Sequence, residues 1–345
     1  MEQQFPKNLI VGPGPHIANT ESIPAIMWTV VISLVPALIA GFINFGWYAM
    51  LIVFVSIASA IATEAVIQKA RKVEVTIYDG SAVVTGLLLA FVLPPNVPIY
   101  VPIIGSMFAI GIAKHAFGGL GMNIWNPALA ARAFLLAAYS SLIVMPKWPI
   151  LNKIYSGSIL SSVDAITMAT PCAILKTAPF AFFDHYSLWE LFIGHIPGSI
   201  GETSALALLA GAIYLIAKKI IRWQLPFFYI LTVMIMVALL PFHNVNGDLI
   251  GFWQVSYWID PVLILEKSLA HAFAGGLILG AFFMATDMVT SPLTKSGQII
   301  FGIGCGVLVA IIRLYGGYPE GVCYSILIMN TFVWLIDRAT SASTI

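Results

Sequence analysis

The sequence predicts an all-α integral membrane protein of about ten transmembrane helices, in two inverted five-helix repeats that each contain a broken helix. Three observations support this fold class. The chain is 60% hydrophobic and 9% charged, whereas a soluble domain carries roughly 25% charged residues. The apolar runs are long enough to cross a hydrocarbon core, which takes about 20 helical residues. Matching residues also recur at one fixed offset along the chain.

Two of the apolar spans end in proline-containing segments. The spans run over residues 26–45, 48–68, 82–94, 99–116, 128–145, 203–218, 225–241, 268–286, 298–314 and 321–337. The third ends in Leu93, Pro94 and Pro95, and the eighth is followed by Asp287 and Pro292. Because proline at membrane depth removes a helix hydrogen bond, the broken backbone must face protein or a polar cavity.

A repeat relates the two groups of five spans. The matching pairs are Pro94 and Pro292, Gly118 and Gly316, Gly119 and Gly317, and Phe134 and Phe332, each 198 residues apart (292−94, 316−118, 317−119, 332−134). Because each half has an odd number of spans, the halves must enter the membrane from opposite sides. This inverted plan places the broken helices around a shared site.

The distribution of Lys and Arg predicts the orientation. Basic clusters at 69–72 and 218–222 fall on one side of the membrane, and the positive-inside rule makes that side cytoplasmic. The chain then divides into a cytoplasmic tail (1–25), a first five-helix half (26–145), an outer loop (146–200), a second half (201–338) and a cytoplasmic tail (339–345). We expect no removable signal peptide, because no small-residue cleavage site follows the first apolar run.

Composition argues against several other functions. Lys and Arg total 16 against 15 Asp and Glu, so no basic excess suggests a nucleic-acid partner. Cys172, Cys305 and Cys323 lack CxxC spacing, and we interpret them as packing residues without a disulfide or metal. His115 and His271 lie at span ends, where a packed, hydrogen-bonded imidazole is the usual case.

Five ionisable residues lie in or beside apolar spans: Glu64, Lys114, Arg132, Asp287 and Arg313. A charge at a helix centre costs roughly 2.5–3.5 kcal/mol on insertion scales, so each needs a partner or a cavity. For Glu64, Lys114 and Arg313 we favour snorkelling to the interface over partners within the protein. Snorkelling explains Arg132 and Asp287 less readily.

Three segments carry a resemblance to a known family: DGSAVVTGLLLAFVLPP from Asp79, GGLGMNIWNPALAARAF from Gly118, and ATDMVTSPLTKSGQIIFGIGCGVLVAIIRLYGGYPEGVCYSILIMN from Ala285. They resemble the D subunit of the Rnf complex, a bacterial ferredoxin:NAD+ oxidoreductase that pumps sodium ions or protons. The homologous B subunit of the sodium-pumping NADH:quinone oxidoreductase shares this pattern. Its members usually carry a longer N-terminal extension, so the Rnf interpretation is preferred.

The resemblance implies a covalent flavin. Members of both families carry FMN joined through its phosphate to a threonine, in a motif of the form Asp, x, x, Ser/Thr, Gly, Ala, Thr. Here Asp164, Thr167, Ala169 and Thr170 match that motif, and Met168 replaces the usual glycine. The resemblance therefore implies FMN on Thr170. Since a proline follows that threonine, it is also suited to cap a helix, and the two roles are compatible.

The resemblance also implies a second flavin, riboflavin, bound non-covalently within the membrane. Asn123 and Asn126 precede the fifth span in a Gly-rich stretch, and Asp287 follows the eighth. Polar groups beside broken backbone are suited to a small polar ligand, so these three residues are the candidate riboflavin site. The alternative is that they cap helix ends and satisfy one another.

The implied function is that of a translocase subunit that is not catalytic alone. It would pass electrons between ferredoxin and NAD+, coupled to Na+ or H+ movement, in the bacterial inner membrane with its flavin loop outside. Since the chain has no nucleotide fingerprint and no cysteine cluster, NAD chemistry must lie on partner subunits. By resemblance these include a second covalent-flavin subunit, and a flavin-attaching enzyme also acts on the chain. The alternative is a secondary transporter or channel with the inverted plan of urea channels, which has no need of the 164–170 motif.

Overall fold

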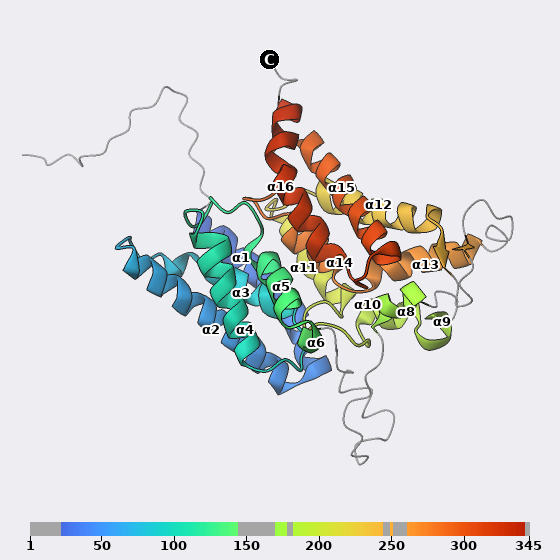
Figure 1. Ribbon diagram of the computed structural model, residues 1–345, viewed down its shortest axis with the longest axis horizontal. Coiled ribbons are helices and arrows are strands. Elements are labelled where there is room, and N and C mark those ends of the chain that lie inside the picture. The colour runs from blue at the N-terminus through green and yellow to red at the C-terminus, as the bar shows by residue number, and fades with distance from the viewer. Residues whose placement is uncertain (1–21, 144–169, 178–181, 244–248, 251–260, 342–345) are drawn as a thin grey trace, which may run out of the picture.

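The computed structural model describes residues 22–143, 170–177, 182–243, 249–250 and 261–341. Helices dominate these residues, and helices α1 to α5 lie beside helices α11 to α16 (Figure 1). The α-helices are α1 (Ile23–Phe45), α2 (Trp47–Ala70), α3 (Ser81–Phe91), α4 (Tyr100–Phe108), α5 (Pro127–Ala138), α6 (Ser140–Ile143), α8 (Pro171–Thr177), α9 (Phe182–His185), α10 (Leu188–Ile193), α11 (Ala205–Ala217), α12 (Gln224–Leu239), α13 (Pro261–Phe273), α14 (Leu277–Leu279), α15 (Lys295–Tyr315) and α16 (Val322–Ser341).

Three short helices and one strand pair complete the described elements. The 3₁₀-helix η1 spans Ile77–Asp79, and the π-helices η2 (Ala109–His115) and η5 (Gly280–Met284) continue α4 and α14. Strands β1 (Phe242–His243) and β2 (Leu249–Ile250) pair antiparallel. The fold is thus helical as predicted, apart from this strand pair.

Several helices match the dimensions of membrane spans. Within the described ranges, α1, α2, α15 and α16 are each long and apolar enough to cross a membrane. A fifth candidate span joins α13 to α14 and η5 with a bend of 64°. Helices α3, α5, α11 and α12 are apolar but shorter than the roughly 20 residues of a full span. The chain therefore has the helices of a multi-pass membrane protein.

Local sequence signals set where these helices begin and end. The Ser204 and Thr294 side chains cap α11 and α15 by accepting hydrogen bonds from backbone N–H groups three residues later, at 3.3 and 3.0 Å. These bonds satisfy donors that a helix start leaves free. Gly46, with a φ of 74°, allows the reversal between α1 and α2 because it has no Cβ.

The break predicted at Pro94 is confirmed. Helix α3 ends at Phe91, and the following backbone pairs with the segment 194–204 that leads into α11. The N–H of Ile200 donates to the Leu93 carbonyl at 3.0 Å, and the N–H of Gly201 donates to the Phe91 carbonyl at 2.9 Å. A Cβ on Gly201 would lie 2.2 Å from Cγ of Phe91, so only glycine allows this pairing.

The second break lies earlier than predicted. The bend separates α13 from α14 at residues 274–276, before Asp287 and Pro292, which instead lie in the turn between η5 and α15. Gly275 has a φ of 68°, a conformation that ends a helix and that favours glycine. The sequence analysis gave weight to the proline and missed this glycine.

Side chains from α15 and from the loop before α16 satisfy the backbone at the second break. The Arg313 guanidinium donates to the carbonyls of His271 and Ala274, the latter at 3.0 Å. The N–H of Gly276 donates to the Glu320 carboxylate at 2.9 Å. Both breaks are therefore bonded by protein groups, as lipid surroundings require.

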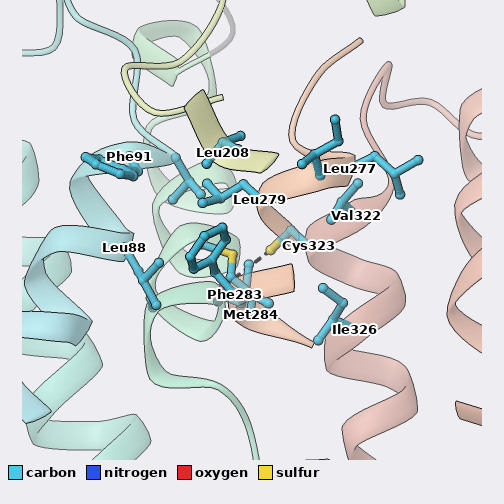
Figure 2. Close-up of a cluster of buried hydrophobic side chains, with 14 of the residues drawn as sticks. Leu88, Phe91, Leu208, Leu277, Leu279, Phe283, Met284, Val322, Cys323 and Ile326 are labelled. Atoms are coloured by element: carbon cyan, nitrogen blue, oxygen red, sulfur yellow. Dashed lines mark hydrogen bonds between the residues drawn. The ribbon is translucent and has the colours of Figure 1, made fainter. Parts of the chain in front are cut away.

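One core joins the first and second parts of the chain. Leu88 and Phe91 from α3, Leu208 from α11, Phe283 from η5 and Ile326 from α16 all lie in a single buried cluster, with Met284 and Cys323 beside them (Figure 2). All three cysteines are buried, as the packing interpretation predicts.

The snorkelling interpretation is wrong for Glu64 and Lys114. They are 1% and 2% exposed, and they form an ion pair between α2 and η2 with Nζ 2.7 Å from Oε1. Lys114 also donates to the Ser81 hydroxyl at 2.6 Å, and His115 lies 3.3 Å from the same carboxylate oxygen. The two charges can be buried within the protein because α2 and η2 place them side by side, away from lipid.

Arg313 is also buried rather than snorkelling, since it is 1% exposed and bonds the carbonyls of the second break. The expectation of a hydrogen-bonded imidazole is confirmed for His115 and is wrong for His271. Neither ring nitrogen of His271 has a hydrogen-bond partner in the described part of the chain.

Removing one partner of the buried ion pair is expected to destabilise the protein. Lys114→Met leaves Glu64 as a buried charge without its cation, which costs about 3–5 kcal/mol. We expect a clear drop in the melting temperature of the purified chain in detergent. The double variant Glu64→Gln with Lys114→Met should recover most of that loss, since no lone charge remains. Lys69→Met, the same change at an exposed lysine, is the control. A single variant as stable as this control would contradict the pairing.

Candidate functional site

A cavity of about 220 Å³ lies where the two helix breaks approach each other. It is lined by Pro94 beside the first break and by Gly275 at the second, and Thr170 opens onto it. We call it the Thr170 cavity. Its other polar lining residues are Arg132, Ser199, Glu202, Thr203, Tyr318, Glu320 and Tyr324, and its apolar ones include Leu136, Ile143, Ile196, Pro197 and Pro319.

Arg132 on α5 is the centre of a buried charge cluster in this cavity. Its Nη1 lies 2.6 Å from the Glu202 carboxylate, which belongs to the segment before α11. Its Nη2 bonds the carboxylate of Glu320, in the loop before α16. The other oxygen of Glu320 accepts the N–H of Gly276. Arg132 therefore has the partners that its place in an apolar span requires, and they come from two separate segments.

The sequence analysis named Arg132 but missed both of its carboxylates. Glu202 and Glu320 stand in Gly-rich connections outside the apolar spans, where an acid is ordinarily solvated. The sequence indicates only that Arg132, as a charge in an apolar span, needs an acidic partner. It does not indicate which acid that partner is.

Thr170 stands directly before α8 at the mouth of the cavity. Its hydroxyl oxygen accepts the N–H of Ala173 at 3.2 Å, which is the cap that the sequence predicts. The hydroxyl is thus held at one edge of a cavity that contains a buried guanidinium. The other motif residues, Asp164, Thr167 and Ala169, lie outside the described residues.

A second cavity, of about 100 Å³, brings together all three predicted riboflavin residues, Asn123, Asn126 and Asp287. We call it the Asn123 cavity. Ser81 and Lys114 also line it, so the buried ion pair of α2 and η2 forms part of its wall. The sequence analysis listed Lys114 as a charge but did not connect it with this site.

The three residues differ in how their side chains are used. The Asn126 oxygen caps α5 by accepting the N–H groups of Ala128 and Leu129 at 3.1 and 3.3 Å. Its amide donates to the carbonyl of Met284 at 3.1 Å. The capping alternative therefore holds for Asn126, and its amide also fixes the end of η5.

Asn123 and Asp287 keep polar atoms for the cavity. The Asn123 amide donates to the Trp125 carbonyl at 3.1 Å, and in the described part of the chain its oxygen accepts no hydrogen bond. One carboxylate oxygen of Asp287 accepts the Thr290 hydroxyl at 3.1 Å and the other accepts the Val289 N–H at 3.5 Å, and a carboxylate oxygen can accept a further hydrogen bond. The three predicted residues do not bond one another in the described part of the chain.

The Thr170 cavity fits part of a flavin. Pockets that enclose a whole drug-sized ligand have volumes of roughly 300–1,000 Å³, so this smaller space suits one ring system rather than an entire FMN. Within the described residues, Nε of Arg132 is a buried donor without a hydrogen-bond partner. A ring that carries carbonyl and imine acceptors offers what such a donor lacks.

Comparison with known proteins places the chain in a family. The model of the NQR2, RnfD, RnfE family matches residues 10–345. The chain is 45% identical to the D subunit of the proton-translocating ferredoxin:NAD(+) oxidoreductase complex of Clostridium ljungdahlii, over 98% of this chain and 97% of the relative. It is 47% identical to the D subunit of the Na(+)-translocating ferredoxin:NAD(+) oxidoreductase complex of Acetobacterium woodii, over 96% and 94%. It is 32% identical to the D subunit of the ion-translocating oxidoreductase complex of an Escherichia coli strain, over 96% of each chain. The chain belongs to the NQR2, RnfD, RnfE family.

Proposed function

We propose that this chain is the D subunit of a ferredoxin:NAD+ oxidoreductase complex of the bacterial inner membrane, which couples electron transfer to the movement of Na+ or H+. Full-length similarity to two relatives named for that activity carries the proposal. The other subunits of the complex, including one with a second covalent flavin, are its partners. The chain has similar sequence identities to a proton-translocating and to a sodium-translocating relative, so the proposal includes both coupling ions.

Helix packing supports the inverted repeat as part of this proposal. Helix α1 packs on α11 and α5 packs on α16, so the first helices of the two halves meet, as do the last. The residues that match at the 198-residue offset have corresponding places: Pro94 and Pro292 in the turns after α3 and η5, Gly118 and Gly316 after η2 and α15, and Phe134 and Phe332 on α5 and α16. Such equivalence is expected for halves related by a pseudo-twofold axis.

Helix directions support the proposed orientation. Tyr48, at the start of α2, donates to the Val97 carbonyl at 2.9 Å, while Lys114 reaches Glu64 near the opposite end of α2. The ends of α2 and η2 therefore share one side, which is the side of the basic cluster at 69–72. With that side cytoplasmic, the end of α6 and Thr170 lie outside, where the flavin is proposed.

Covalent FMN on Thr170 completes the proposal. When bound, a flavin accepts two electrons together and gives them up singly. Thr170 supplies the attachment hydroxyl at the mouth of a cavity, and Arg132 supplies a buried positive charge within it. A covalent tether retains a cofactor on a face of the membrane where free FMN is scarce.

The tether gives a direct test. The denatured wild-type chain, produced together with a flavin-attaching enzyme, is expected to fluoresce under ultraviolet light after electrophoresis. Thr170→Ala should abolish the band because the ester oxygen is gone. Thr170→Ser should retain fluorescence if the enzyme accepts a primary hydroxyl. Thr63→Ala is the matched control, since that hydroxyl bonds only within α2, to the Ser59 carbonyl at 2.7 Å.

A wild-type band without fluorescence under these conditions would remove the main support for a redox role. The channel interpretation would then be preferred, because a channel built on broken helices requires no flavin.

We further propose that the Asn123 cavity binds part of a non-covalent riboflavin. Asn123 and Asp287 would bind its polar edge, and Lys114 adds a nearby cation. Asn126 would act by holding α5 and η5 in place rather than through a free amide.

Asp287→Ala is expected to release riboflavin while the Thr170 band stays fluorescent, since it removes one wall of the cavity. The measurement is the flavin extracted from the purified chain with acid, which leaves covalent flavin on the protein. Asp337→Ala is the control, because that carboxylate accepts the Leu293 N–H at 3.0 Å outside the cavity. Riboflavin content equal in both variants and wild type would exclude this site.

A further inference from the structure

The Thr170 cavity contains one guanidinium held between two carboxylates. Arg132 is 7% exposed and Glu202 is 4% exposed, so neither charged group is solvated by bulk water. Nη1 of Arg132 lies 2.6 Å from Oε1 of Glu202, and Nη2 bonds the carboxylate of Glu320. Charges in such surroundings act on their neighbours more strongly than in water.

One nitrogen of this guanidinium makes no hydrogen bond in the described part of the chain. Both Nη atoms are bonded to carboxylates, but within the described residues Nε of Arg132 is buried and has no partner. A buried donor without an acceptor is unfavourable, and native proteins seldom leave one. The residue lines the cavity, so an acceptor on an occupant of that space would complete this hydrogen bond.

The cluster also has a fixed position relative to Thr170. Cys172, two residues after it, packs against the second helix break: a Cβ on Gly275 would lie 2.9 Å from Sγ of Cys172 and 2.5 Å from Oε1 of Glu320. The same carboxylate holds the Gly276 N–H. The start of α8, the helix break and the Arg132 cluster are therefore packed together around the cavity.

We propose that Arg132 binds the flavin on Thr170 and sets its reduction potential. Its Nε–H donates to an acceptor of the flavin, and its positive charge favours the reduced cofactor, which is more negative than the oxidised one. Glu202 and Glu320 hold the guanidinium in place, and their negative charges act on the flavin in the opposite direction. The electron comes from the donor subunit of the complex, and Arg132 keeps its proton throughout. This inference rests on the proposed covalent FMN.

The proposal predicts opposite shifts for opposite charges. Arg132→Gln removes a positive charge and is expected to lower the potential. Glu202→Gln removes a negative charge and is expected to raise it. We expect at least a tenfold change in the reduction equilibrium constant for each, which is about 59 mV for a one-electron step. Arg132→Lys keeps the charge but loses Nε–H, so its potential should lie between those of Arg132→Gln and wild type.

The experiment is a potentiometric titration of the full chain in detergent, produced with a flavin-attaching enzyme and followed by flavin absorbance. The signal of the covalent flavin is the part that Thr170→Ala lacks. The control is Arg222→Gln, the same chemical change at a guanidinium that bonds the Leu293 carbonyl away from this cavity. Its potential should equal that of wild type. If Arg132→Gln fails to fold, Glu202→Gln gives the answer alone.

A purely structural cluster would lower the melting temperature of these variants and leave the potential unchanged. Fluorescent bands with potentials equal to wild type would therefore overturn the role of Arg132 while the proposed function stands. A wild-type chain without a fluorescent band would overturn both.

Discussion

Backbone groups that leave a helix inside an apolar environment find no water to bond, so the protein itself must bond them. The rest of this structure follows from that constraint at two places. After α3, the backbone of 194–204 pairs with the broken end. Between α13 and α14, Arg313 bonds the freed carbonyls and Glu320 accepts the freed N–H. The groups that satisfy the breaks come from distant segments, and this is why both parts of the chain meet there.

The cavities arise at those meeting points. The Thr170 cavity touches both breaks, through Pro94 and Gly275. Each cavity also has a buried cation in its wall, Arg132 in one and Lys114 in the other, and each cation is paired with a carboxylate from another segment. A buried pair adds little net stability, but it is costly to break. The charges are therefore fixed in position, which is the condition for acting on a cofactor in a predictable way.

Several candidate ligand residues also cap helices. Thr170 caps the start of α8, and Asn126 caps α5 while it holds the carbonyl of Met284. This double use has a simple cause. A capping side chain directs its oxygen to the end of a helix, and in a membrane protein with broken helices the ends of helices are where polar cavities form. A residue can thus fix the backbone and face a ligand from the same place.

The sequence by itself determined the properties that depend on composition and local order. Long apolar runs predicted the membrane helices, Pro94 predicted the first break, and a threonine before a proline predicted the cap at Thr170. The three segments of resemblance indicated the family that the comparisons show. The sequence also selected Asn123, Asn126 and Asp287, although 158 residues separate Asn126 from the carbonyl that it bonds.

Only the tertiary structure decided which charges pair. Arg132 and its two carboxylates are 70 and 188 residues apart in the chain, and Glu64 and Lys114 are 50 apart. No periodicity relates residues at such distances, because their contact depends on how whole helices pack. For the same reason the sequence misplaced the second break, where Arg313 and Glu320 stabilise a bend at Gly275 that no proline marks. A local pattern shows that a buried charge needs a partner, but the packing of the helices determines which residue that partner is.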